Sequence, residues 1–333
     1  MSFVRPIGRV LAATGFAALL AAGSPALAQT KWDISLPWGP SEFHTLNAIK
    51  FAEEVKKVTN GEVQMTVHPG SALGVRANES VRALQDGVVP MAEYAAFQNT
   101  GELDLLGVEA LPFLVANYDE LRVMLGIARQ PWSDALARKS QKVLYMVPWP
   151  SQNFFLKREV RSFEDLKGVK MRVYDKNSSD MVTALSMVPQ QLNNPDVVPA
   201  LASGRADGVM TSGTTAVAQK YWEFLSHAYN TNHLWALNFM AVNLDAWKKL
   251  KPEHQKAIEE LAQKMEPSFW EVSQKEHDVR IAELQKNGMK YAVAPKDMVD
   301  RMRQATAVTW DNYTKLGPVH AKIVADYRAK TGK

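Results

Sequence analysis

The stretch "DLKGVKMRVYD", residues 165–175, predicts a β-strand, because apolar and basic side chains alternate within it. One face of this strand would carry Val169, Met171 and Val173, and the other would carry Lys170, Arg172 and Tyr174. The guanidinium of Arg172 would then stand near the end of the strand. Two interpretations follow. Either this is an edge strand with a solvated face, or Arg172 faces a cleft and binds an anion.

Strand and helix patterns alternate through the rest of the chain. Apolar residues recur at helical spacing from residue 42 to 58, and a second long helix is predicted from 118 to 140. Residues 236–244, "ALNFMAVNL", predict a strong strand. From Pro252 onward the pattern is almost entirely helical, and Pro267 is expected to kink or break a long helix. This order predicts an α/β fold with mixed, mostly parallel sheets flanked by helices.

The predicted strands gather in two clusters, before and after about residue 150, and the strand at 236–244 follows the second cluster. No internal repeat, low-complexity tract or flexible linker separates the clusters. We therefore expect two lobes that are joined by crossing strands or a helix, which would act as a hinge rather than a tether.

Residues 1–28 have the pattern of a secretory signal peptide. Two arginines and no acidic residue accompany an apolar run from about residue 10 to 22, and Ala26 and Ala28 occupy the small-residue positions of a cleavage site. We expect the chain to be exported and cut between Ala28 and Gln29. The apolar run is too short to span a bilayer as a helix.

The charge balance is nearly neutral once this leader is removed, with 37 basic and 35 acidic side chains left. Such a balance argues against a nucleic-acid-binding protein, which usually has a marked basic excess. The sequence contains no cysteine, which excludes thiol catalysis and cysteine-type zinc sites. The 305 remaining residues are enough for one large core or two smaller ones.

The chain carries no recognisable nucleotide-binding or catalytic motif. It has no GxxxxGK[ST], no GxGxxG after a strand and no G-x-S-x-G. Glu223, His227 and His233 invite a metal interpretation, but their segment is typical of strand and loop, so a structural role is expected. His44 is likewise expected to cap or line rather than to catalyse. We therefore expect no metal and no cofactor.

Polar and aromatic residues gather at predicted strand ends and turns. In open α/β sheets, ligands bind outside the carboxyl ends of the strands. A planar guanidinium such as that of Arg172 is suited to a carboxylate. The candidate ligand-binding residues are Arg172, Gln152, Trp38, Tyr94, Trp149, Tyr174, Asn193, Asn194, Thr211, Ser212 and Trp235.

Two segments together resemble a known family. "SFEDLKGVKMRVYD", residues 162–175, is followed downstream by "ALASGRADGV", residues 200–209. This combination is similar to the solute-binding proteins of tripartite ATP-independent periplasmic (TRAP) transporters, the DctP-like family. The resemblance extends to the leader and to the long kinked helix, and it covers essentially the whole mature chain.

The resemblance implies a periplasmic binding protein of two lobes that close on an organic anion. Lobe I would comprise residues 29–149 and 238–277, lobe II would comprise residues 150–237 and 278–333, and a long kinked helix would join them. Arg172 would pair with the carboxylate of the anion. The implied partners are this ligand and the membrane permease subunits of a TRAP transporter. The C-terminus gives no clear dimer signal, so a monomer is expected.

Three positions depart from the pattern of the family. Gln152 stands where many members have a second arginine, and Thr211 and Ser212 stand where an asparagine is common. Asn193 and Asn194 replace an aromatic residue that often stacks on the ligand. A single arginine with several aromatics favours a monocarboxylate, such as an aromatic, 2-oxo or 2-hydroxy acid. The apolar walls would come from Trp38, Tyr94, Trp149 and Trp235.

The sequence leaves two other functions open. An exported hydrolase or lyase acting on a carboxylate substrate would use Asp207, His44 or His233, although no nucleophile–base pair has a recognisable spacing. A binding protein of a different transporter class is the other. We expect a binding protein and not an enzyme, and tight, saturable binding without product formation would separate the two.

Overall fold

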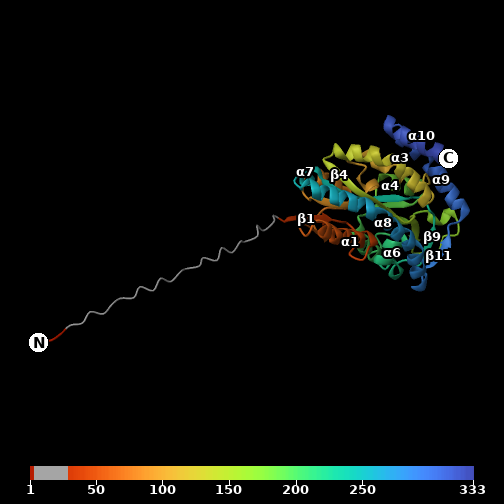
Figure 1. Ribbon diagram of the computed structural model, residues 1–333. Helices are drawn as coiled ribbons and strands as arrows, with labels where there is room; N and C mark the ends of the chain where they lie inside the picture. Colours follow the sequence, from red (N-terminus) through yellow and green to blue (C-terminus); the bar gives the residue numbers. More distant parts are fainter. Residues whose placement is uncertain (4–28) are drawn as a thin grey trace.

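The computed structural model describes residues 1–3 and 29–333 (Figure 1). The predicted signal peptide falls almost wholly on residues 4–28, which lie outside this description. Among the helices that are described, none combines the length and the apolar character needed to cross a membrane.

The first sheet has five strands in the order β2-β1-β3-β10-β4. β1 pairs in parallel with β2 and β3, whereas β10 runs antiparallel to both β3 and β4. The chain thus returns to this sheet late, through the strand that the apolar run at 236–244 predicted. The strands are β1 (Thr30–Ser35), β2 (Val63–His68), β3 (Met91–Ala95), β4 (Gln141–Trp149) and β10 (Ala236–Asn243).

The second sheet has six strands in the order β11-β9-β5-β8-β6-β7. β5 runs antiparallel to β8 and β9, and the other pairings are parallel. β6, which carries Arg172, lies between β7 and β8 and is not an edge strand. The strands are β5 (Asn153–Leu156), β6 (Lys170–Val173), β7 (Val188–Gln191), β8 (Gly208–Thr211), β9 (His227–Asn230) and β11 (Lys290–Val293).

Helices cover both sheets, which completes the predicted α/β architecture with mixed sheets. The two helices predicted at 42–58 and 118–140 are α1 and α3, and the side chain of Asn117 caps α3 by accepting from the Glu120 amide at 2.8 Å. The helices are α1 (Phe43–Val58), α2 (Ser80–Gln85), α3 (Tyr118–Ala137), α4 (Lys176–Ala184), α5 (Val197–Ala202), α6 (Gly213–Ala218), α7 (Leu244–Lys248), α8 (Pro252–Lys286), α9 (Lys296–Thr314) and α10 (Pro318–Thr331).

The chain crosses between the two lobes four times, and the last crossing leads through residues 315–317 from α9, which packs on α4 of the second lobe, to α10. Residues 150–152 lead from β4 to β5, and residues 231–235 lead from β9 back to β10. The two segments run side by side, since the Gln152 amide donates to the Leu234 carbonyl at 3.0 Å. The third connection is α8, which packs against α1 and β4 of the first lobe and against α6 of the second (Figure 1). Crossing segments and a helix are the joints expected where no flexible linker exists.

The structure decides one open expectation and adds one strand. α8 continues through Pro267 as one helix of 35 residues, so of the two effects expected there, a kink or a break, the break is wrong. The buried side chains of Met265 and Phe269 hold the helix on the core on either side of the proline, which offsets the lost backbone hydrogen bond. β11, at residues 290–293, was not expected in a region that reads as helix.

The C-terminal helix α10 lies beside α3, on the first lobe (Figure 1). Ile323, Val324 and Tyr327 are buried in the same apolar cluster as Trp132 of α3. The hydroxyl of Tyr327 donates to the Leu114 carbonyl at 3.1 Å. The predicted division placed residues 278–333 in the second lobe, and this packing moves the last helix to the first.

Candidate functional site

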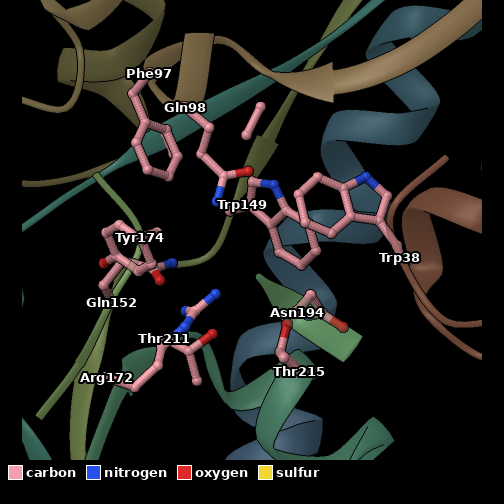
Figure 2. A pocket seen from close by; sticks show the side chains of 12 residues that line it. Trp38, Phe97, Gln98, Trp149, Gln152, Arg172, Tyr174, Asn194, Thr211 and Thr215 are labelled. Atoms are coloured by element: carbon pink, nitrogen blue, oxygen red, sulfur yellow. The ribbon is translucent and has the colours of Figure 1, made fainter. Parts of the chain in front are cut away.

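A cavity of about 30 Å³ lies between the two sheets, at the carboxyl ends of β1, β3, β4, β6 and β8. This is the edge at which ligands bind in open α/β sheets. From the first lobe it is lined by Trp38, Ala95, Phe97, Gln98, Trp149 and Ala236, and from the second by Gln152, Arg172, Tyr174, Asn194, Thr211 and Thr215 (Figure 2).

Arg172 is the charged member of this lining. Its neighbours Met171 and Val173 face the apolar core, so the alternation of the strand turns the guanidinium into the cavity (Figure 2). The side chain is 4% exposed, which rules out the solvated-edge interpretation of this strand. Its Nε donates to the Leu192 carbonyl at 3.1 Å, and its Nη1 donates to the Met210 carbonyl at 3.3 Å.

No carboxylate lies within salt-bridge distance of the Arg172 guanidinium in residues 29–333. Burial lowers the pKa of Arg172 from its usual value, but an arginine stays protonated in proteins. Two of its five N–H groups are used by backbone carbonyls, and the ring of Tyr174 lies 4.9 Å from its central carbon. The site therefore contains a buried positive charge with unused donors.

Polar groups of the second lobe surround this charge. Oδ1 of Asn194 accepts from Nε2 of Gln219 at 2.5 Å, which leaves the amide nitrogen of Asn194 for other partners. Nε2 of Gln152 donates to the Pro150 carbonyl at 3.0 Å. The hydroxyl of Tyr174 is buried and has no hydrogen-bond partner among the described residues. Burial raises the pKa of this phenol well beyond its usual range, so it stays protonated.

The first lobe supplies an aromatic wall. The rings of Trp38 and Trp149 meet edge to face with centroids 4.9 Å apart. Phe97 makes a similar contact with Tyr174 of the second lobe at 5.1 Å, so an aromatic pair bridges the two lobes at the cavity. Figure 2 shows Gln98 beside this wall, with its side chain extending into the space opposite Arg172.

A buried polar chain fixes the wall from behind. Nε1 of Trp149 donates to Oδ1 of Asn238 at 2.7 Å, and Nδ2 of Asn238 donates to Glu93 at 2.9 Å. The hydroxyl of Tyr145 donates to the other oxygen of Glu93 at 3.2 Å. His44 Nδ1 lies 2.8 Å from Glu93 but outside hydrogen-bond alignment. His44 thus supports the wall from the rear, in keeping with the structural role expected for it.

Comparison with known proteins shows the family to which this chain belongs. Residues 34–316 match the model of the DctP family, described as bacterial extracellular solute-binding protein, family 7. The chain belongs to this family. It is therefore a solute-binding receptor of the TRAP type for small organic acids, and not an enzyme. Receptors of this type act outside the cytoplasm together with membrane permease components.

One relative that matches in sequence and two that superpose in structure illustrate the similarity. The C4-dicarboxylate-binding periplasmic protein DctP of Rhodobacter capsulatus is 29% identical over 260 residues, which is 77% of each chain. A marine metagenome TRAP solute-binding protein specific for pyroglutamate superposes with a TM-score of 0.86 at 29% identity, covering 90% of this chain and 99% of the other. DctP7 of Bordetella pertussis, a receptor binding pyroglutamic acid, gives 0.87 at 25% identity with the same coverage.

The fold of this solute-binding protein brings seven of the eleven predicted site residues to the cavity. They are Arg172, Gln152, Trp38, Trp149, Tyr174, Asn194 and Thr211. They reach it from both lobes, although they are spread over more than 170 positions of the sequence.

The other four predicted residues do not line the cavity. Tyr94 is fully buried in the first lobe, where its hydroxyl donates to Gln141 at 3.0 Å. Trp235 packs on Tyr118 at 4.7 Å and donates to Asn232. Ser212 caps α6 instead, and Asn193 precedes the turn that carries Asn194. All four residues flank or end strands near the cavity, but their side chains are not among those that line it.

Five lining residues were missed. Ala95, Phe97 and Gln98 come from the end of β3 and the 3-10 turn η2 (Ala96–Asn99), and Thr215 and Ala236 come from α6 and the start of β10. The two alanines carry no chemical signal, and Phe97, Gln98 and Thr215 are of types too common along the chain to stand out. The one available hint is position, because Phe97 and Gln98 directly follow a strand end.

The residues considered for catalysis lie elsewhere. Asp207 faces Lys170 at 3.6 Å and Lys157 at 3.8 Å on the outer surface of the second lobe. Nδ1 of His233 is 2.7 Å from the Thr231 hydroxyl, and burial lowers the pKa of this histidine to about 3, so it is neutral at pH 7. The described residues contain no group of three or more histidines and acids arranged to hold a metal ion.

Proposed function

We propose that this protein captures a small organic monocarboxylate in the periplasm by closing its lobes around an ion pair between the ligand and Arg172. It would then deliver the ligand to the permease of a TRAP transporter. The observation that carries the proposal is the guanidinium of Arg172, which is 4% exposed, faces the cavity and has no carboxylate partner in the described chain.

Burying the guanidinium of Arg172 without a salt-bridge partner costs free energy of folding. A buried charge without a counter-charge destabilises a protein by several kcal/mol. The free N–H groups of Arg172 form a planar fork, which matches the two oxygens of a carboxylate. Thr211 and the amide of Asn194 lie beside it to satisfy further lone pairs. A ligand carboxylate would therefore remove a cost that the empty site bears.

The cavity also limits the size and charge of the ligand. Its enclosed volume is only about 30 Å³, so the lobes as they stand leave little room and favour a small ligand. One cation in the lining favours one carboxylate, and the neutral Gln152 adds none. Pyroglutamate is the first candidate, because two similar receptors bind it. Aromatic, 2-oxo and 2-hydroxy acids of similar size are the alternatives within the class.

A thermal-shift screen followed by calorimetry tests the proposal. The panel contains pyroglutamate, lactate, pyruvate, benzoate and succinate, with the uncharged amide of pyroglutamate as the matched control. A ligand at 100 times its dissociation constant should stabilise the folded protein by about 2.7 kcal/mol. The proposal fails if no carboxylate raises the melting temperature, or if the uncharged amide binds as tightly as the acid.

We also infer that the mature protein begins at Gln29 and is a monomer. The small-residue pattern at Ala26 and Ala28 supports the cleavage site. Intact-mass measurement of the exported protein would give the first residue. Light scattering should return the mass of one 305-residue chain, and a dimer mass would contradict the second inference.

A further inference from the structure

Gln98 presents a free carboxamide to the cavity. It lies on η2 of the first lobe, and Figure 2 shows its side chain reaching into the space opposite the guanidinium of Arg172. Its Oε1 is buried and accepts no hydrogen bond from any described residue. A buried acceptor without a donor costs stability, and native structures contain few of them.

The turn that carries Gln98 is held firmly. The next residue, Asn99, accepts from the Val81 amide at 3.1 Å. Its Nδ2 donates to the carbonyls of Ala77 at 2.9 Å and Ala95 at 3.1 Å. These three bonds tie η2 to the neighbouring turn and to the end of β3. The position of Gln98 is thus preorganised, although its amide lacks a partner within the chain.

The surroundings of this amide narrow the chemistry of its partner. The lining residues that share its lobe are Trp38, Ala95, Phe97, Trp149 and Ala236, and their side chains offer no acceptor. A carboxamide presents one donor and one acceptor side by side. A second amide whose N–H and C=O point to the same side, as in a lactam or a primary amide, satisfies both through two parallel hydrogen bonds, whereas a hydroxyl must use one oxygen for both.

We propose that Gln98 determines ligand specificity by pairing with a lactam or primary amide group of the ligand while Arg172 holds its carboxylate. This inference rests on the proposed function, since Arg172 must hold the carboxylate for the amide of the ligand to face Gln98. A dicarboxylate would place a second anion against Oε1 of Gln98. An aryl acid would leave both polar atoms of the amide unpaired.

Three five-membered ring acids of nearly equal shape test this pairing by calorimetry. Pyroglutamate has both the ring N–H and the C=O, 5-oxotetrahydrofuran-2-carboxylate keeps only the C=O, and cyclopentanecarboxylate has neither. The wild-type protein should bind them in that order. Each lost group should weaken binding at least about fivefold, because a polar group of Gln98 is then left unpaired.

The variant Gln98→Leu has a similar volume and no polar atoms. It should bind all three acids within about threefold of one another, with cyclopentanecarboxylate held at least as tightly as by the wild type. Retained binding of that acid also shows that the variant folds. Gln285→Leu, on the exposed end of α8, is the matched control and should keep the wild-type order.

The outcomes separate the two proposals. If the wild type binds the three acids equally, or if Gln98→Leu keeps the wild-type order, the role of Gln98 is overturned while the ion pair at Arg172 stands. The same holds if the wild type binds other carboxylates but none of these three. If no carboxylate binds at all, the proposed function falls together with the role of Gln98.

Discussion

The two lobes build the cavity from different chemistry. The second lobe contributes the cation Arg172 and hydroxyl or amide groups such as Thr211 and Asn194. The first lobe contributes aromatic rings and, as its polar lining residue, Gln98. This division suggests that the second lobe attracts and orients an anion, whereas the first lobe closes over it, excludes water and tests its shape. Exclusion of water strengthens the electrostatic contacts made on the other side.

A second contrast separates structural from functional polar groups. Glu93, behind the wall of the first lobe, has Asn238, Tyr145 and His44 around its carboxylate. Arg172, on the second lobe, has backbone carbonyls but no salt-bridge partner in the described chain, although the buried Asp175 carboxylate attracts it from beyond contact distance. Most buried polar groups of native proteins are satisfied within the fold. An unsatisfied group at a cavity therefore indicates what the cavity is built to hold.

Removing the cation should have the largest effect on binding. Arg172→Ala should weaken the binding of the cognate acid by at least about 3 kcal/mol, because the ligand anion would be buried unpaired. Arg172→Lys should also bind poorly, since the fork geometry is lost. Calorimetric titration gives the affinity, and the melting temperature without ligand shows whether the variants fold. If a folded Arg172→Ala variant bound the acid with near-normal affinity, the second lobe would not be the one that binds the anion through its cation.

The stability of the folded protein should depend on pH through Glu42, which lies where the two lobes meet. This first-lobe residue is 2% exposed and contacts Thr215 of α6 without a well-aligned hydrogen bond, with Glu276 and Arg280 of α8 nearby. Burial raises its pKa from 4.5 to about 7. Its stabilising effect is therefore complete below about pH 4.5 and is lost as the pH rises through 7.

Glu42→Gln should consequently be more stable than the wild type at pH 8, by up to about 3 kcal/mol, and the difference should shrink toward pH 5. Denaturant unfolding of both proteins from pH 5 to 8 measures this. Glu109, whose pKa burial raises to about 8, is present in both proteins and cancels in the difference. If the free energy of unfolding of the two proteins changes in parallel with pH, Glu42 does not become a buried charge between the lobes as the pH rises.

A second cation on the second-lobe side of the cavity should change which ligand the protein prefers. Gln152→Arg places a guanidinium beside Arg172, and it should raise the affinity for succinate relative to pyroglutamate by about tenfold through a charged hydrogen bond. Competition calorimetry with the two acids measures the ratio. Gln285→Arg adds the same charge on an exposed helix and should leave the ratio as it is. An unchanged ratio in Gln152→Arg would count against contact between residue 152 and the ligand.

The smallest effect on binding is expected for Phe97 and Tyr174, the aromatic pair that bridges the two lobes. Phe97→Leu removes the edge-to-face contact with Tyr174, which is worth about 0.5–1.5 kcal/mol, so affinity should fall roughly two- to tenfold. A double-mutant cycle with Tyr174→Leu isolates this contact from the packing of each ring on its own lobe. Strict additivity of the two changes would mean that the pair does not hold the lobes together.

The alternation in residues 169–173 was sufficient to predict the strand and the side of it on which Arg172 lies. Arg172, one of the two basic residues of this strand, was then taken as the centre of the candidate site. The same local reasoning placed Tyr94 and Trp235 in the site, and both are core residues instead. For an aromatic residue at a strand end, sequence does not distinguish a cavity wall from a core, because both environments are apolar.

The sequence by itself therefore determined the α/β class, the two lobes, the family and the arginine, since each follows from periodicity or from a local motif. Only the tertiary structure decided that Phe97, Gln98 and Thr215 line the same cavity as Arg172, and that α10 returns to the first lobe. The reason is physical. Local patterns fix which way a side chain points from its own element, whereas the surface it then faces is set by the packing of distant sheets and helices.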